Sequence, residues 1–530
     1  MSQRSALSAT SCLGLLVLGV TVHPDRARAQ ARESKDPLPV IDLSGHPGFP
    51  LPRHLESSDI AAGKVTFRQV FDAGQALFHV EYTAEDGVGA MRLPDGSKIL
   101  RFSRLPPGGG AGAEISSQSC VRCHVGSSSG PSQANVLSDP DNDGKPPFLV
   151  RNTSSLFGDG ILQLLAQEVT EDLHAIKDDT ERAAKARPGV KVERPLESKG
   201  VRYGTIAATA GASGNVTFDL SRVEGIDADL VVRPLGWKGN IPTVRLFNVG
   251  AAALVMSLQA EELVWKLAEK GAPPDADGDG VERELSVGDI TAMAVYGAAL
   301  ETPQSAERLA ELGLVQSLSA EDRARIERGR QAFASVGCAS CHVPTMHLGN
   351  TVFEEPTLRG NGNYYDAMLA ARDPGYDPKR PVRFDVLRDA KEPRAEADPK
   401  GGAIIRLYGD LKRHRMGRQL SDPTGPVVPF TAGFAPVVAD GKPVPVGPSD
   451  FLTPELWGVG NTGPWLHDGR AASLREAIAG HGEDDPSPAG SPERSEAQEA
   501  RDAFSGLAKE DQVALLTFLH SLQTFPLPSK

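Results

Sequence analysis

Two stretches of this chain carry one five-residue pattern: Cys120-Val-Arg-Cys123-His124 and Cys338-Ala-Ser-Cys341-His342. The chain has five cysteines, and the fifth, Cys12, lies close to the N-terminus. Two thiols spaced by two residues and followed directly by a histidine are typical of covalent haem c attachment, in which the imidazole becomes an iron ligand. A disulfide framework would explain the paired cysteines but not the histidine after each pair. The patterns therefore predict two covalent haem c groups, with His124 and His342 as iron ligands.

The N-terminus has the features of an export signal. Arg4 precedes an apolar run, Leu13 to Val22, and the small-x-small triplet Ala27-Arg28-Ala29 follows it. The run is shorter than the roughly 20 residues that a membrane-spanning helix needs, and the triplet is typical of signal-peptidase cleavage. We expect residues 1–29 to be removed after Ala29, which leaves a periplasmic protein with no membrane span. An uncleaved anchor is the alternative.

The sequence around the two motifs repeats one plan. A polar helix is expected before each motif, at Val65–Val80 and at Ala320–Ser335. An apolar helix is expected at the end of each half, at Leu285–Leu300 and at Leu507–Leu522. Thr153–Gly160 (TSSLFGDG) also matches Thr453–Gly460 (TPELWGVG). The repeat predicts a mainly α fold of two cytochrome-c-like haem domains with long loops.

The spacing of the repeat predicts the domain boundaries. The first haem domain is expected at residues 30–303, a linker at 304–319, and the second haem domain at 320–530. The Thr153 segment begins about 30 residues beyond His124, whereas the matching Thr453 segment begins more than 100 residues beyond His342. The second domain therefore carries a predicted insertion at about residues 344–450.

The second face of each haem decides its chemistry, because an iron with two strong protein ligands transfers electrons and an open face can bind oxygen or peroxide. In the second half, a short helix expected after Ser473 ends at Gly480-His481-Gly482, where the glycines would let a haem approach closely. His481 is therefore a candidate for the second ligand. Its rivals are His414, Met416 and His467.

The first half offers no such residue near its motif. Between His124 and Asp172 the sequence contains no histidine, methionine or cysteine. A haem with one strong ligand is expected to be high-spin and reactive. Cleaving an O–O bond also requires protons, and Gln163, Gln167 and Glu168 are polar candidates for this step. We predict Gln163 and Glu168 as catalytic residues, although each could equally be an ordinary polar helix residue.

Two acidic loops, Asp139–Gly144 and Asp275–Gly280, begin with the Asp-x-Asp-x-Asp-Gly pattern of a calcium-binding loop. Neither carries the glutamate expected at position twelve, where Val150 and Ser286 stand. Acidic turns held by their own hydrogen bonds would explain both loops equally well. Whether they bind calcium stays open at this point.

At these residues the chain resembles the di-haem cytochrome c peroxidase and MauG superfamily, in particular its peroxidase-like branch of di-haem oxidoreductases. The matching segments besides the two haem motifs are Arg151–Thr153, Gly236–Lys238, Asp275–Gly280, Thr453–Gly458 and Pro464–Arg470. They cover about residues 65–525 in order, and the predicted insertion matches least.

The resemblance implies roles at particular positions. In this family the second ligand of the C-terminal haem lies fourteen residues beyond the histidine of a His-Asp-Gly motif, as a methionine or a tyrosine. Here that motif begins at His467 and the position holds His481, which implies two histidine ligands and a lower potential than methionine would give. The resemblance also implies a calcium ion between the haems, bound by the Asn152 side chain and the backbone carbonyls of Thr462 and Pro464.

Two family features are missing from the chain. It lacks the distal histidine shortly after the first haem motif, and it lacks the Phe-Trp-Asp-Gly-Arg segment that bears the family's bridging tryptophan. If an aromatic side chain relays electrons, the candidates are Trp237, Trp457 and Trp465.

The leading hypothesis is a periplasmic di-haem oxidoreductase, most simply a peroxidase. Electrons from a small redox protein would enter at the haem of His342 and His481 and reach the haem of His124, where hydrogen peroxide is reduced to water. The net charge of −13 argues against a nucleic-acid partner, which requires a basic surface.

Three alternatives stay open. A non-catalytic electron-transfer cytochrome would need a hidden second ligand on the first haem, such as His79, His174 or Met416. A di-haem oxygenase, like the related rubber-cleaving enzymes, would bind oxygen instead of peroxide. A MauG-like enzyme would oxidise a partner protein.

Overall fold

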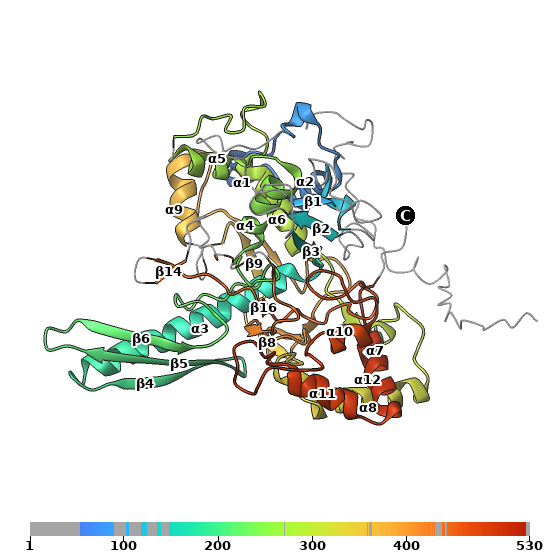
Figure 1. The fold of residues 1–530 in the computed structure, drawn as a ribbon. Coiled ribbons are helices and arrows are strands. Elements are labelled where there is room, and N and C mark those ends of the chain that lie inside the picture. Colours follow the sequence, from blue (N-terminus) through green and yellow to red (C-terminus); the bar gives the residue numbers. More distant parts are fainter. Residues whose placement is uncertain are drawn as a thin grey trace, which may run out of the picture.

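The computed structural model describes residues 54–88, 102–104, 118–124, 135–138, 148–269, 271–357, 359, 363–423, 425, 427, 429, 437–439 and 442–525. The expected signal peptide and the Asp139–Asp143 loop lie outside these residues. Among the described residues, 36% are helical and 17% lie in strands of several antiparallel sheets. The prediction of a mainly α fold is therefore wrong, and the fold is mixed α/β (Figure 1).

The α-helices of the described residues are α1 (Ser57–Ala61), α2 (Phe67–His79), α3 (Asp159–Lys185), α4 (Val244–Ala251), α5 (Glu261–Ala268), α6 (Val287–Ala298), α7 (Ala306–Glu311), α8 (Ala320–Ser335), α9 (Asn363–Arg372), α10 (Leu474–Ala479), α11 (Gln498–Gly506) and α12 (Lys509–His520). A π-helical turn, Ala252–Met256, continues α4.

The strands are β1 (Phe102–Arg104), β2 (Asn135–Ser138), β3 (Leu149–Asn152), β4 (Val192–Ser198), β5 (Val201–Ala210), β6 (Val216–Val223), β7 (Gln304–Ser305), β8 (Met346–Leu348), β9 (Val352–Glu355), β10 (Val382–Asp385), β11 (Glu396–Ala397), β12 (Ala403–Ile405), β13 (Arg413–Arg415), β14 (Val438–Ala439), β15 (Lys442–Pro443), β16 (Asp450–Leu452) and β17 (Leu522–Gln523). They form small antiparallel sheets, among them β1-β2-β3, β4-β5-β6 and β11-β12-β8.

The sheet β4-β5-β6 explains much of the error in the predicted fold class. It packs on α3, and together they extend away from the other elements on the left of Figure 1. The sequence of β5 (VRYGTIAATA) combines β-branched, aromatic and small residues, and all its side chains except Arg202 are buried or half-buried. Such residues suit a packed sheet. The prediction of helices rests on the sequence around the two haem motifs, and the three strands of this sheet are remote from both motifs in the sequence.

The predicted repeat is confirmed by two equivalent helix crossings. α2 packs on α6 in the first half, and α8 packs on α12 in the second; Figure 1 shows one pair in its upper part and the other in its lower part. A Cβ atom added to Gly74 would lie 2.0 Å from the carbonyl oxygen of Ala292, and one added to Gly329 would lie 2.0 Å from that of Ala514. Both crossings therefore depend on a glycine that lets two backbones touch.

The loops that match between the halves are also placed alike. A Cβ atom on Gly160 would lie 2.3 Å from the carbonyl oxygen of Ala298, at the end of α6, and one on Gly460 would lie 2.4 Å from that of His520, at the end of α12. The loops thus cross equivalent helices at equivalent positions. The repeat read from the sequence is a repeat of packing as well.

Side-chain caps fix where the paired helices begin. Thr66 and Gln69 exchange hydrogen bonds at the start of α2, and Ser286 and Asp289 form the same capping box at α6. Ser319 accepts a hydrogen bond from the first turn of α8. These contacts satisfy backbone N–H groups that the first turn of a helix leaves without partners.

The predicted linker and the predicted insertion both contain regular elements. Within residues 304–319, β7 pairs with β17 near the C-terminal end and α7 follows at once. From the insertion, strands β8, β9 and β12 contribute Met346, Phe353 and Ala403 to the hydrophobic core that includes α2 and α6. The insertion therefore packs against the first half. The domain boundaries stay a prediction.

None of the helices in the described part of the chain combines the length and the apolar character needed to cross a bilayer.

Candidate functional site

Both Cys-x-x-Cys-His motifs adopt the same local structure. Cys120–Arg122 and Cys338–Ser340 each form one 3-10 turn. In both, the N–H of the histidine donates to the carbonyl of the first cysteine at 3.0 Å. None of the four motif cysteines forms a disulfide. Burial raises the pKa of Cys120 to about 12 and that of Cys338 to about 11, so without a bound group these thiols are protonated at neutral pH.

Each motif histidine lies beside a phenylalanine of the preceding helix. The ring centres are 5.8 Å apart for Phe78 and His124, and 6.3 Å apart for Phe333 and His342. Each phenylalanine lies four residues beyond the glycine of its helix crossing. The repeated crossing therefore places the two histidines in equivalent surroundings.

In the second half, His481 faces His342. The centres of the two imidazole rings are 6.4 Å apart and the ring planes differ by 55°. A metal ion bound by one nitrogen of each ring would hold the centres roughly 6 Å apart, since each metal–nitrogen bond is about 2 Å and each nitrogen lies about 1 Å from its ring centre. The observed separation therefore suits two histidine ligands of a single metal ion.

Both rings are also oriented for such a role. The Nδ1 atom of His342 donates to the carbonyl of Tyr408 (3.0 Å), and that of His481 donates to the carbonyl of Ala477 (2.7 Å). Donation at Nδ1 leaves the lone pair on Nε2, which is how proteins commonly orient histidine ligands. Burial lowers the pKa of His342 to about 4 and also lowers that of His481. Both imidazoles are therefore neutral at neutral pH.

A cavity of about 310 Å³ lies beside these two rings. Cys338, Cys341, His342 and His481 line it, with mainly apolar side chains around them. It continues into the first half, where α3 and the Gly236–Lys238 region contribute to its wall. This cavity has the apolar lining and the paired imidazoles that suit a covalently attached haem.

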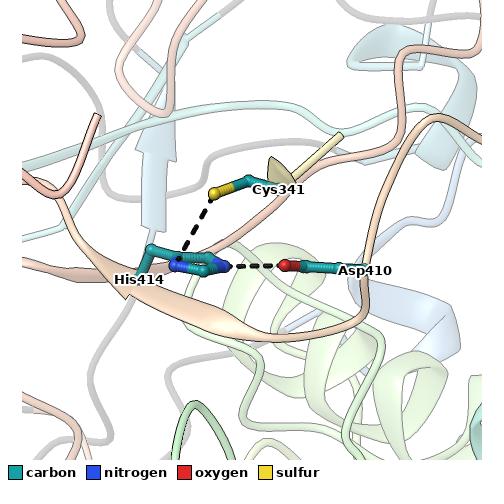
Figure 2. A group of neighbouring side chains, drawn as sticks. All are labelled: Cys341, Asp410 and His414. Atoms are coloured by element: carbon teal, nitrogen blue, oxygen red, sulfur yellow. Dashed lines mark hydrogen bonds and ion pairs between the residues drawn. The ribbon is translucent and has the colours of Figure 1, made fainter. Parts of the chain in front are cut away.

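The rival ligand His414 is committed to other partners (Figure 2). Its Nε2 atom is 2.7 Å from Asp410 and its Nδ1 atom is 2.8 Å from Glu496, while the sulfur of Cys341 lies 3.8 Å away. Burial opposes protonation, but these partners outweigh it and raise the pKa of His414 to about 12. Without a metal ion both ring nitrogens therefore carry hydrogen, and their contacts with two carboxylates favour a structural role over iron ligation.

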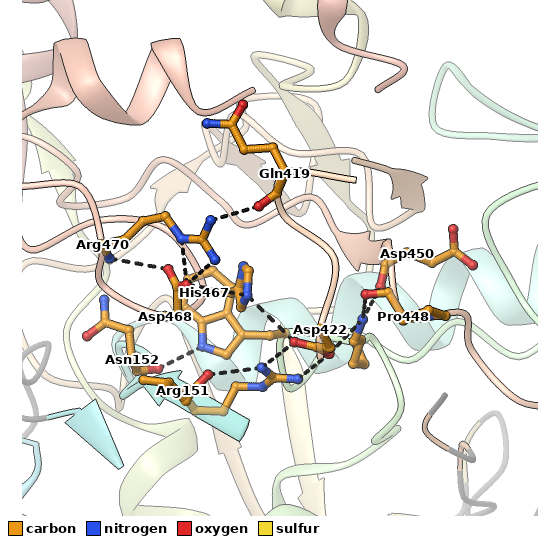
Figure 3. Close-up of polar contacts among 12 residues, drawn as sticks. Arg151, Asn152, Gln419, Asp422, Pro448, Asp450, His467, Asp468 and Arg470 are labelled. Carbon is orange, nitrogen blue, oxygen red and sulfur yellow. Dashed lines mark hydrogen bonds and ion pairs between the residues drawn. The ribbon is translucent and has the colours of Figure 1, made fainter. Parts of the chain in front are cut away.

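The other rival histidine, His467, belongs to a polar network (Figure 3). Its ring stacks on Phe451 with centres 4.3 Å apart, and its Nε2 atom lies 3.6 Å from Asp422. Arg151 binds the same carboxylate through hydrogen bonds of 2.8 and 2.7 Å, and Lys238 lies 3.0 Å from it. The network joins the first half to the insertion and to the His-Asp-Gly motif. The remaining rival, Met416, lines the cavity.

His124 is half-buried, and its buried Nδ1 atom has no hydrogen bond of ordinary geometry from the described residues. Burial lowers its pKa to about 4, although the nearby Ser154 backbone opposes this effect. The segments that flank its motif, 105–117 and 125–134, lie outside the described residues. Within the described residues, His124 has no second histidine facing it as His342 does.

The structure identifies Met256 as a residue near the first motif that sequence reasoning missed. Its sulfur lies 3.8 Å from the sulfur of Cys120. Met256 is buried at the end of the π-helical turn after α4. Nothing in the sequence marks this contact, because the two residues are far apart in the chain and π-helical turns have no simple pattern.

Two residues named as hidden ligands for the first haem have other partners. His174 donates from Nε2 to the carbonyl of Asp229 at 2.8 Å. His79, at the end of α2, donates from Nδ1 to the carbonyl of Gln75 at 2.7 Å, which leaves the lone pair on Nε2. His79 therefore has the tautomer of a ligand, and His174 does not.

The two predicted catalytic residues lie in different surroundings on α3. Gln163 is fully buried, and its Oε1 atom accepts a hydrogen bond from the N–H of Val244 at 2.7 Å. Its Nε2 atom has no hydrogen-bond partner among the described residues. Gln163 therefore keeps a free N–H donor in the interior.

Glu168, in contrast, is fully engaged. It forms an ion pair of 2.5 Å with Lys199 and accepts the N–H groups of Gly349 (3.1 Å) and Asn350 (2.5 Å). Burial would raise its pKa, but these donors outweigh burial and lower it. Glu168 is thus ionised at neutral pH and attaches the insertion to α3. These contacts favour a structural role over proton donation.

Of the three residues implied as calcium ligands, the structure brings Asn152 and Pro464 into contact. The Nδ2 atom of Asn152 donates to the carbonyl of Pro464 at 2.8 Å, while its buried Oδ1 atom has no partner among the described residues. Thr462 lines the adjoining cavity. An unpaired buried amide oxygen next to a carbonyl oxygen is an arrangement that a hard cation such as calcium could satisfy.

The three candidate tryptophans all line the same cavity. Each indole N–H donates to a backbone carbonyl: Trp237 to Asn152 (2.7 Å), Trp457 to Arg406 (3.1 Å) and Trp465 to Val459 (2.9 Å). Trp457 of the second half also packs on Gly158 of the first, where an added Cβ atom would lie 2.3 Å from the ring. It therefore bridges the two matching loops.

The Asp275–Gly280 loop is held by its own hydrogen bonds. The Asp275 carboxylate accepts the N–H groups of Gly278, Asp279 and Gly280 at 2.6, 3.2 and 3.0 Å. Asp275, Asp277 and Asp279 lie close enough for one ion, and burial with the neighbouring carboxylates raises the pKa of Asp277 to about 7. These hydrogen bonds are the ones expected of an acidic turn without a bound ion. Calcium binding by the loop stays an open question.

Comparisons with known proteins add little to this geometry. No protein-family model matches the chain, and no curated protein matches it. Among solved structures, a MauG-like protein associated with microbial copper homeostasis aligns with 59% of this chain and 78% of its own, with a TM-score of 0.27 and 15% sequence identity. A TM-score this low establishes neither fold nor function.

Proposed function

We propose that the chain is an exported di-haem c-type oxidoreductase that reduces hydrogen peroxide at the haem of His124, using electrons passed on from the haem of His342 and His481. The difference between the two histidine sites carries this proposal. His342 has a second histidine at ligand distance, and His124 has no such partner among the described residues. An iron bound on both faces transfers electrons, whereas an open face can react.

Haem would supply one-electron redox chemistry and, on a face without a second protein ligand, a place for peroxide to bind. The cysteines of each motif would form thioether bonds, and the neutral Nε2 atoms of His342 and His481 would close both faces of the second haem. These roles are supported by the backbone hydrogen bonds at Nδ1 of both rings. Peroxide would therefore be excluded from that site.

Gln163 is the side chain that we propose to position peroxide at the first haem. Its buried Nε2 atom is a donor without a partner, and an amide can orient a peroxide oxygen without exchanging a proton itself. Its Oε1 atom is fixed by the N–H of Val244, which sets the direction of the donor. Protons must then come from other groups.

We also propose a calcium ion at Asn152, Thr462 and Pro464, and a small basic redox protein as electron donor. The unpaired Oδ1 atom of Asn152 supports the ion. The net charge of −13 supports the charge of the donor, because opposite charges speed the encounter of redox partners.

The decisive experiment is low-temperature electron paramagnetic resonance of the purified holoprotein with and without hydrogen peroxide. The proposal expects one low-spin signal from the haem with two histidines and one high-spin signal, of which peroxide changes the high-spin signal first. Two low-spin signals that peroxide leaves unchanged would instead identify an electron-transfer cytochrome, with Met256 or His79 as the hidden ligand. Stable binding of oxygen to the reduced protein would favour an oxygenase.

A further inference from the structure

Two acidic side chains, Asp159 and Glu455, line the cavity beside His342 and His481. Ser154, whose backbone lies near His124, lines the same cavity. The two acidic residues come from the matching loops of the two halves, but from different positions in them. The residue that corresponds to Asp159 is Val459, and the one that corresponds to Glu455 is Ser155. The acidic pair is therefore a feature of the junction between the halves and not of the repeat.

No basic side chain of the described residues pairs with either carboxyl group. Asp159 is only 8% exposed, and no side chain or backbone group of the described residues donates a hydrogen bond to its carboxylate. Glu455 is half-buried, and its own backbone N–H is the donor closest to its carboxylate. Among the charged side chains, Glu455 is the one that acts on Asp159.

The charged groups on the adjoining segment are already paired. The backbone of Gly409 packs on Glu455, and the two charged residues that flank it are Arg406 and Asp410. Arg406 lies 3.0 Å from Glu396, and Asp410 lies 2.7 Å from His414. No free cation of this segment therefore neutralises the two carboxylates.

Burial keeps protons on both groups, and the charge of Glu455 adds to this effect at Asp159. Burial raises the pKa of Asp159 well above its ordinary value, and Glu455 raises it further. Burial also raises the pKa of Glu455 to about 7. Two carboxyl groups that line one mainly apolar cavity, one of which raises the pKa of the other, cannot easily ionise together, so the pair retains at least one proton at neutral pH.

We propose that Asp159 and Glu455 form a proton-carrying pair that binds a proton when an electron enters the cavity and releases it for peroxide reduction. This inference rests on the proposed function and names a proton store for the same site. Reduction of one peroxide consumes two electrons from the redox partner and two protons, and it yields two water molecules. Each arriving electron adds a negative charge beside the pair, which strengthens proton binding from solvent; when the electron moves on to peroxide, the binding weakens and the proton can follow.

The test measures the midpoint potentials of the holoprotein by spectroelectrochemistry at several pH values around 7, where Glu455 titrates. One proton bound per electron changes the equilibrium constant tenfold per pH unit, which shifts the potential of a one-electron couple by about 59 mV. We expect one haem potential to fall with rising pH by a large part of this slope. Asp159→Asn and Glu455→Gln should each remove most of the slope, because a pair needs both members.

A matched control is Glu193→Gln, which removes an exposed carboxylate on β4 that is 2.6 Å from Arg222; it should keep the native slope. The reduced-minus-oxidised infrared spectrum should show a carboxylic C=O band that is lost in both test variants. A native protein without the slope, or two test variants that retain it, would overturn the inference. If either Asp159→Asn or Glu455→Gln does not fold, the slope measured with the other variant tests the inference.

The proposed function is tested separately, because haem content and the peroxide-sensitive high-spin signal do not depend on the acidic pair. A protein without haem would refute the function. A protein with haem and a peroxide response, but with potentials independent of these two residues, would refute only the proton-carrying pair. Calcium binding that disappears in both variants would also overturn it, since the pair would then be a cation site.

Discussion

The imidazole rings of His342 and His481 face each other with centres 6.4 Å apart, and each donates its Nδ1 hydrogen to a backbone carbonyl. The two carbonyls belong to segments that are distant in sequence, Tyr408 of the insertion and Ala477 of α10. His481 follows directly after this short helix, whose first turn is capped by Ser473. The insertion and the helix end thus fix the two rings independently.

Replacing His481 should change the spin state of one haem only. In His481→Ala we expect a new high-spin signal, because the iron at His342 loses its second ligand. His481→Met should restore a low-spin haem with a higher midpoint potential than the native one, since methionine ligation raises the potential. Electron paramagnetic resonance and spectroelectrochemistry measure both effects.

The control for this pair of variants is His347→Ala, because the side chain of His347 is 51% exposed. It should leave both signals unchanged. A His481→Ala protein that keeps its low-spin signal would show that Met416 or another cavity residue binds the iron.

The glycines at the helix crossings should be intolerant of a single added methyl group. At Gly329 the new Cβ atom would lie 2.0 Å from the carbonyl oxygen of Ala514, so α8 and α12 must separate. Overpacking of this kind typically costs about 1–3 kcal/mol, and a backbone collision should reach the upper end. Denaturant unfolding of Gly329→Ala should show this loss, and Gly74→Ala should behave alike at the other crossing.

Gly506→Ala is the control for the crossings, because no heavy atom lies within 4 Å of its added Cβ and an alanine stabilises a helix by roughly 0.5–1 kcal/mol relative to glycine. Its unfolding midpoint should rise or stay unchanged. Equal losses in Gly329→Ala and Gly506→Ala would contradict the close packing of the crossing.

The parts of the site that could be predicted from the sequence are those set by spacing. The positions of the cysteines, of His124 and of His342 depend on residues close together in the chain. The repeat was predicted from segments of similar sequence in the two halves, although the helices that cross are distant from each other in the chain. The ligand role of His481 was implied by the family resemblance, in which the second ligand lies fourteen residues beyond the histidine of the His-Asp-Gly motif. The relative positions of residues this close in the chain are set by the local helix or turn and depend little on what packs around it.

The parts that could not be predicted depend on contacts between distant segments. Three such contacts join residues from different elements. The carbonyl of Tyr408 orients His342, two carboxylates keep His414 protonated, and Met256 contacts Cys120. The sheet β4-β5-β6 lies outside the repeat around the two haem motifs, on which the predicted fold class rested. Its strands follow one another directly and pair in antiparallel order, and the packing of β4 and β5 on α3 adds contacts that the sequence of the strands does not show.

Glu168 should contribute to stability and little to peroxide reactivity. Its pKa is lowered in the folded chain by Lys199 and two backbone N–H groups. Its stabilising effect is therefore present above the unfolded-state pKa of roughly 4.3 and is lost as the pH falls through the lowered folded-state value. Glu168→Gln should lower the free energy of unfolding by about 1–3 kcal/mol at neutral pH. The difference in this free energy between the variant and the native protein should become smaller in acid.

Glu171→Gln is the matched control for Glu168, because Glu171 lies one turn on in α3 and its 2.8 Å ion pair with Arg359 involves a side chain that is 43% exposed. Exposed pairs of this kind contribute about 1 kcal/mol or less. Urea unfolding at several pH values separates the two variants. A peroxide rate that falls in Glu168→Gln at unchanged haem content would restore the catalytic prediction made from the sequence.

Removal of calcium should weaken the junction between the halves. A chelator is expected to lower the unfolding temperature of the native protein, because Asn152 and Pro464 come from opposite halves and an ion would tie them together. Asn152→Leu should unfold at the lower temperature with or without chelator, whereas Asn152→Asp, which keeps an oxygen ligand, should still respond. A native protein whose unfolding temperature ignores both calcium and chelator would contradict the site.

Gln163 should affect peroxide chemistry more than its neighbour Gln167 does. Gln163→Leu removes the acceptor for Val244 and the free Nε2 donor, whereas Gln167→Leu removes a hydrogen bond to Thr357 of 3.0 Å. Each change loses one buried hydrogen bond, so both should destabilise the chain by about 1–3 kcal/mol. Only Gln163→Leu should also slow the reaction with peroxide, by roughly 10²-fold if the donor orients peroxide. Stopped-flow mixing of each holoprotein with peroxide measures this difference, and equal rates in the two variants would show that Gln163 is a structural residue alone.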